Sequence, residues 1–217
     1  MGVNQEATIF LSQLKRVDQC DGLIKMQGFA IDAGGTSLQE FNDCVLEPNA
    51  YFCNPFDGEY DRAFMPLIGG LEMSGPDGKT LEINPGKIFA GSVRAPISKI
   101  HNPQGERVNF LEFVFTPGTG WIRDGCELEF EMEINKLVPL AITGEKCKAW
   151  LGQYKGREQD YLFVDGCHKR ILVYVIDGVF EVQDRLLHAR DGLELCGFTT
   201  IEFEALSENS IILFQGV

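Results

Sequence analysis

The chain has 217 residues, 44% of them hydrophobic and 24% charged, so it can bury one large or two small cores and is not a disordered chain. A formal net charge of -13 opposes binding to nucleic acid, which depends on Lys and Arg neutralising phosphates. No run approaches the ~18 apolar residues of a membrane helix, which argues against membrane insertion.

The seven cysteines are scattered and form no Cys-x-x-Cys pair. Such a set is typical of reduced thiols that behave as small buried hydrophobes, and it argues against a zinc site. We therefore expect a soluble cytoplasmic protein without disulfides.

In chain order, short apolar runs bounded by Gly, Pro, Asn and Asp predict strands throughout and little helix. The most polar loop of the first half covers residues 54–62, and a second loop, 94–103, carries Lys99 and His101. The predicted strands of the first half are 8–14, 23–31, 41–52, 67–73, 80–83 and 108–115.

The strand 108–115 is apolar on both faces apart from Asn109 and Glu112. Because side chains alternate along a strand, this pattern predicts a strand covered on both faces. A carboxylate such as Glu112 on a covered strand needs a partner.

A domain boundary is predicted at Pro117-Gly118-Thr119-Gly120, which divides the chain into 1–119 and 120–217. After it, apolar residues alternate with Glu from 126 to 134, which predicts a half-exposed strand with an acidic outer face. We interpret this face as a solvated sheet edge, although it could also bind a cation or a basic partner.

The second half repeats the pattern of the first. The run 67–72 resembles 175–180, Pro85-Gly86 matches Asp191-Gly192, and Gly91 matches Gly197. Each copy ends in an apolar strand, 108–115 in the first and 211–214 in the second. This order of strand, turn and glycine predicts a tandem duplication of one β-unit.

These residues resemble the pirin family of tandem cupins. The resemblance rests on 42–47, 67–70, Asn84-Pro85-Gly86, 108–117 and most of the second half from Lys136. It implies an all-β fold of two cupin domains, which are double-stranded β-helices of jelly-roll type.

The resemblance also implies a metal in the first cupin, held by a His-x-His pair and a His-x-Glu pair; such a set suits Fe, Mn, Ni or Cu. Some family members cleave flavonols such as quercetin. This chain has Asn54-Pro55-Phe56 at the first pair and Lys99-Ile100-His101 at the second. Phe56 has no atom that can coordinate a metal, and protonated Lys99 has no lone pair. We therefore expect no metal and no catalytic residue.

Two further hypotheses concern the same place. Glu59, with Asp57 and Asp61, could join His101 in a carboxylate-rich site for a harder cation, although a solvated acidic loop is the better explanation, because nothing fixes the geometry of these residues. Alternatively, the ammonium of Lys99 could take the place of the ion and pair with Glu112 or Glu59. The pocket candidates are thus Asn54, Phe56, Glu59, Lys99, His101 and Glu112.

The sequence has no nucleophile elbow, P-loop or Gly-x-Gly-x-x-Gly motif, and His168 and His188 have no ligand spacing. We expect a non-catalytic, pirin-like binding or regulatory protein whose partner is a small molecule or a protein. The alternative is a cupin dioxygenase with a divalent metal near His101. The ligand, the pathway and the oligomeric state do not follow from the sequence.

Overall fold

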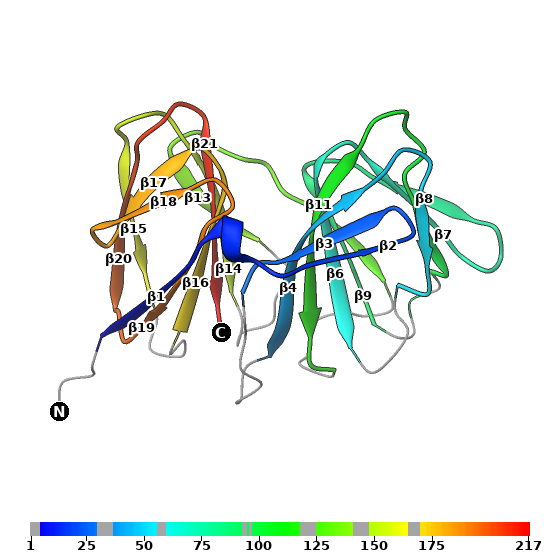
Figure 1. Ribbon diagram of the computed structural model, residues 1–217, viewed down its shortest axis with the longest axis horizontal. Helices are drawn as coiled ribbons and strands as arrows, with labels where there is room; N and C mark the ends of the chain where they lie inside the picture. The colour runs from blue at the N-terminus through cyan, green and yellow to red at the C-terminus, as the bar shows by residue number, and fades with distance from the viewer. Residues whose placement is uncertain are drawn as a thin grey trace. The chain divides into compact units, whose positions relative to one another are not determined.

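The computed structural model describes residues 5–29, 37–55, 60–92, 95, 97–117, 125–140, 148–164 and 170–217. In these ranges the chain forms strands β1 to β21 and one 3-10 turn, η1 (Ser12–Leu14), and no α-helix (Figure 1). The predicted all-β class is therefore confirmed. None of the described segments is a helix that could cross a bilayer.

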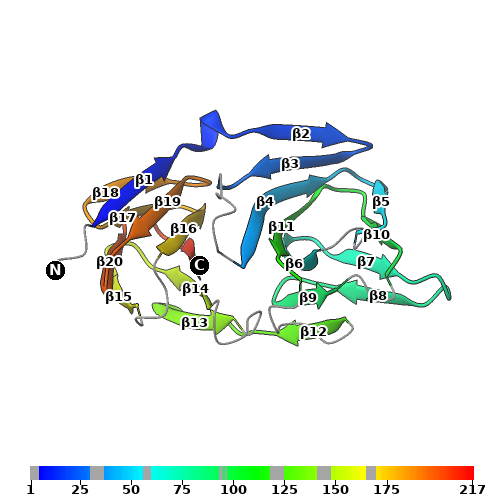
Figure 2. The ribbon, with the colours of Figure 1, turned by 90° about the horizontal axis from the view of Figure 1, so that it is seen from below.

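The chain forms two compact units, each built from one large and one small antiparallel sheet. We call residues 16–130 the first barrel, and residues 131–217 together with 1–15 the second barrel. Figure 2 shows the strands of both units from a second direction.

In the first barrel the large sheet has the order β12-β9-β6-β11-β4-β3-β2 and the small sheet the order β5-β10-β7-β8. The strands are β2 (Val17–Cys20), β3 (Leu23–Gln27), β4 (Leu38–Leu46), β5 (Tyr51–Cys53), β6 (Asp61–Ile68), β7 (Leu71–Ser74), β8 (Thr80–Ile83), β9 (Lys87–Gly91), β10 (Lys99–His101), β11 (Val108–Phe115) and β12 (Cys126–Glu129).

In the second barrel the large sheet has the order β1-β19-β16-β21-β14-β13 and the small sheet the order β15-β20-β17-β18. The strands are β1 (Glu6–Phe10), β13 (Lys136–Leu140), β14 (Ala149–Tyr154), β15 (Gln159–Phe163), β16 (Arg170–Asp177), β17 (Val179–Val182), β18 (Arg185–His188), β19 (Gly192–Cys196), β20 (Thr200–Ala205) and β21 (Ser210–Gly216).

The two barrels repeat one strand order, as the duplication predicts. In each, a central strand (β11 or β21) lies between partners that correspond, β4 and β6 in the first barrel and β14 and β16 in the second. Both pairs β11–β6 and β21–β16 shift register near the same end, at Asn109/Phe110 and at Val175/Asp177. The duplication is therefore visible in the pairing as well as in the sequence.

The repeated glycines correspond less closely than the sequence suggests. The turn after β6 has its positive φ at Gly69 (+74°), and the turn after β16 has it at Gly178 (+81°), so the first turn is one residue longer. Gly91 lies inside β9, whereas Gly197 follows β19. The strand order is conserved between the copies, but the turn lengths are not.

The units also differ from the predicted division at 119/120. Strand β1 pairs with β19, from Glu6 opposite Cys196 to Phe10 opposite Gly192, so the amino-terminal strand belongs to the second barrel. Strand β12 pairs with β9 and stays in the first barrel. Strand partners far apart in the chain leave no local signal, which is why the sequence placed both strands in the wrong unit.

The acidic strand predicted for residues 126–134 is shorter than expected. It ends at Glu129 and forms the edge of its sheet, where Glu127 and Glu129 pair with Lys87 at 2.6 and 3.2 Å. The interpretation as a charged sheet edge thus fits its position.

Each barrel has its own apolar core. The first includes Phe64, Phe110 and Ile100, and the second includes Phe180, Phe203 and Phe214. Strand β11 is buried along almost its whole length, as its two apolar faces predict.

Deleting residues 1–10 should expose the outer edge of β19, because β1 covers that edge. We expect the β19 amides that face β1 to lose hydrogen-exchange protection, while the β16–β21 ladder keeps it. The β9–β12 ladder of the first barrel is the control. Unchanged protection in β19 would show that β1 does not belong to the second barrel in solution.

Candidate functional site

The residues predicted to line a pocket do not converge on one point. Phe56, Glu59 and the neighbouring Asp57 lie outside the described residues. Asn54 follows β5 with a φ of +52° and is exposed, and its backbone N–H donates to the Ser98 carbonyl at 2.7 Å.

Lys99 and His101 lie on the outer face of the small sheet of the first barrel. Between them, Ile100 is fully buried in the core, so alternation along β10 turns both neighbours away from the interior. The Lys99 ammonium lies 4.4 Å from the centre of the Tyr51 ring, and His101 Nδ1 lies 3.5 Å from Glu72 Oε1. The structure therefore does not place either residue inside the barrel.

Among the predicted residues that the structure describes, Glu112 is the one that faces the interior. Its side chain is 1% exposed, and its carboxylate accepts from Lys25 Nζ at 2.7 Å, from Arg62 Nη1 at 2.6 Å and from Asn42 Nδ2 at 3.0 Å. The partner that the sequence required thus exists, but it is Lys25 and Arg62 rather than Lys99. We call these four side chains the polar layer.

The polar layer follows from strand alternation across four neighbouring strands. Glu112 is two residues beyond Phe110 on β11, and Arg62 is two residues before Phe64 on β6, so both lie on the face that carries the barrel core. In the same way, Lys25 is two residues beyond Leu23 on β3 and Asn42 two residues before Cys44 on β4.

Sequence reasoning identified Glu112 but missed Lys25 and Arg62. Lys25 interrupts an otherwise apolar strand, and this is the feature of the sequence that could have indicated a buried partner for it. Its partnership with Glu112 depends on a register between distant strands that the sequence does not display.

Electrostatics keep Glu112 ionised. Burial alone would raise its pKa, but the charges of Lys25 and Arg62 and the hydrogen bonds from Lys25 and Asn42 outweigh burial and hold the pKa below its ordinary value. Next to it, burial and the charge of Glu112 raise the pKa of the Cys44 thiol well above its usual value. Cys44 is therefore a neutral core residue rather than a reactive thiolate.

Aromatic rings fill the interior beside the polar layer. The ring centroids of Phe52, Phe64 and Phe110 are 6.1 to 6.4 Å apart. Among the described residues, no group of three His, Cys, Asp or Glu side chains could hold a metal ion.

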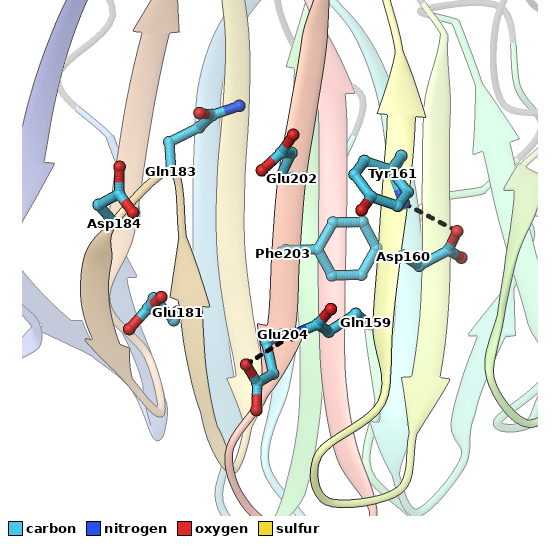
Figure 3. A pocket seen from close by; sticks show the side chains of 9 residues that line it. All are labelled: Gln159, Asp160, Tyr161, Glu181, Gln183, Asp184, Glu202, Phe203 and Glu204. Carbon is cyan, nitrogen blue, oxygen red and sulfur yellow. Dashed lines mark hydrogen bonds between the residues drawn. The ribbon is translucent and has the colours of Figure 1, made fainter.

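A second candidate is a hollow on the small sheet of the second barrel, which sequence reasoning missed (Figure 3). Five carboxylates line it, and two are already engaged: Glu204 accepts from Arg157 and Gln159 at 3.1 and 3.0 Å, and Asp160 accepts from the Tyr154 hydroxyl at 2.6 Å. Burial and the hydrogen bond to Asp160 raise the pKa of Tyr154. The lining residues are Gln159, Asp160, Tyr161, Glu181, Gln183, Asp184, Glu202, Phe203 and Glu204.

The other residues identified in the sequence analysis belong neither to the polar layer nor to the hollow of the second barrel. Asp61 begins β6 and lies on the opposite face of that strand from Arg62, so it does not join His101. His188 is exposed on β18, and His168 lies outside the described residues.

Comparison with known proteins identifies the fold. Residues 147–215 match the family model Pirin_C_2, described as the quercetinase C-terminal cupin domain. Among solved structures, YhhW from Escherichia coli is 15% identical with a TM-score of 0.80 and covers 98% of both chains. The chain therefore has the fold of the pirin-type cupin proteins.

Two further solved structures resemble this chain in fold. The bacterial pirin YhhW from Escherichia coli in complex with nickel(II) is 15% identical, with a TM-score of 0.78, and covers 97% of this chain and 98% of that one. Quercetin 2,3-dioxygenase from Acinetobacter baumannii is 13% identical, with a TM-score of 0.70, and the match covers 96% of this chain and 85% of that one. No curated protein matches by sequence.

Replacing Glu112 by Gln in this pirin-type protein should destabilise the first barrel by about 3 kcal/mol at neutral pH, because Lys25 and Arg62 lose their counter-charge. Urea unfolding followed through the amide signals of β11 measures this. Glu133→Gln, which breaks an exposed pair with Lys136, should cost at most about 1 kcal/mol.

The cost of Glu112→Gln should also depend on pH. Because folding lowers the pKa of Glu112, its contribution is complete above the unfolded value of about 4.3 and disappears as the pH falls through the folded value. The difference between wild type and Glu112→Gln should therefore shrink in acid. A difference that stays constant down to the acid unfolding transition would contradict an ionised Glu112.

Proposed function

We propose that this pirin-type protein is a non-catalytic binding or regulatory protein whose first barrel lacks the family metal site. The observation that carries the proposal is the arrangement of the expected ligands. His101 and Lys99 face outward on β10, and the buried carboxylate of Glu112 is held by two cations and an amide.

The chemistry of Glu112 supports this reading. A carboxylate has about four lone-pair positions, and three hydrogen bonds already use most of them. Coordinating a metal would also bring a third cation beside Lys25 and Arg62, which Coulomb repulsion opposes.

The proposed partner is a small molecule or a protein in the cytoplasm. The net charge of -13 opposes nucleic acid and anionic membrane surfaces, whose charge has the same sign. The acidic hollow of the second barrel adds to this negative surface.

A second candidate is a metal-dependent dioxygenase. The family model named for quercetinase and the structural likeness to a quercetin 2,3-dioxygenase favour it. Under this alternative, a divalent metal would bind near His101 with an unconventional set of ligands.

Metal analysis of the protein purified without chelators separates the two candidates. We expect less than about 0.1 equivalent of Fe, Mn, Ni, Cu or Zn, since a site with one good nitrogen ligand binds weakly. Incubation with quercetin should leave its absorbance unchanged. A stoichiometric metal that is lost in His101→Ala but kept in His188→Ala would establish the second candidate instead.

A further inference from the structure

The polar layer presents positive charge to solvent. The side chain of Glu112 is 1% exposed, whereas those of Arg62 and Lys25 are 18% and 31% exposed. Solvent thus reaches the two cations while their shared counter-ion stays behind them. Within the four side chains of the polar layer, two cations face one buried carboxylate.

Arg62 uses only part of its guanidinium. Its Nη1 donates to Glu112, while its Nε is buried and makes no hydrogen bond within the described part of the chain. The edge formed by Nε and Nη2 is a planar fork with two donors, which matches a carboxylate. Arg107 shows such an edge in use, because its Nε and Nη2 bind Glu47 at 2.9 and 2.8 Å.

The duplicated barrel shows that the fold does not need a polar layer. The register of β21 with β14 and β16 places an apolar residue at each corresponding position of the second barrel, and these residues belong to its core or contact it. The counterparts of Lys25, Asn42, Arg62 and Glu112 are Leu137, Trp150, Ile171 and Phe214.

Replacing a buried ion pair by well-packed apolar residues of similar volume is often neutral or even stabilising. The polar layer therefore needs a reason other than holding the barrel together. Its charged groups, and the edge of the Arg62 guanidinium that makes no hydrogen bond to the described residues, suggest that the reason is ligand binding.

We propose that the polar layer binds a small monocarboxylate anion, held by the guanidinium of Arg62 and by the Lys25 ammonium. The inference rests on the proposed non-catalytic function and names its ligand class. Glu40, exposed and accepting from Asn42 at 3.3 Å, places a negative charge beside the layer. With the net charge of -13, it disfavours phosphate and other multiply charged anions.

The test follows the Arg62 Nε–H signal by NMR while sodium acetate or sodium benzoate replaces sodium chloride at constant ionic strength. We expect a saturable shift of this signal, with inorganic phosphate binding more weakly. Arg62→Lys keeps the charge but removes the fork, so it should weaken binding at least about tenfold by calorimetry. The matched control, Arg107→Lys, should bind as the wild type does.

A second variant guards against a folding defect. Lys25→Leu, Arg62→Ile and Glu112→Phe together install the residues of the second barrel, so the barrel should stay folded and lose carboxylate binding. No saturable shift in the wild type, tighter binding of phosphate than of acetate, or unchanged binding in the folded triple variant would each overturn the proposal.

Metal content measured on the same samples keeps the two proposals apart. A metal-free protein without a saturable shift refutes the carboxylate site alone. A protein that carries stoichiometric metal and still shows the Arg62 shift refutes the non-catalytic function and supports the carboxylate site.

Discussion

The first barrel depends on one constraint, the solvation of a buried carboxylate. Glu112 lies in the middle of a strand that is otherwise almost entirely buried, and an isolated charge there would be strongly unfavourable. It is tolerated because β3, β4 and β6 each place one polar side chain on it. These contacts require one particular register of four strands, since a shift by one residue would turn the partners to the other face.

The same alternation separates the chemistry of the two faces of each sheet. On β10, burying Ile100 obliges Lys99 and His101 to lie on the outer face, where they meet Tyr51 and Glu72. On β11, burying Phe110 obliges Glu112 to lie inside. The position of a residue in the sequence motif therefore says less about its role than the face on which its strand places it.

The sequence predicted what short-range patterns encode. Apolar runs and turn residues predicted the all-β class, the two apolar faces of β11 and the duplication, because alternation and turn chemistry act over a few residues. It did not predict that β1 joins β19, or that Lys25 and Arg62 meet Glu112. Those pairings join residues from 50 to 190 positions apart, and only the folded register brings them together.

The two barrels together separate what the fold requires from what it only permits. Both keep the same strand order and the same register shift beside the central strand, so these features belong to the architecture. At the level of Glu112 one barrel is charged and the other is apolar, as Phe214 shows, so this level is free to vary. Because the apolar solution sustains the second barrel, the fold itself does not need the charged one.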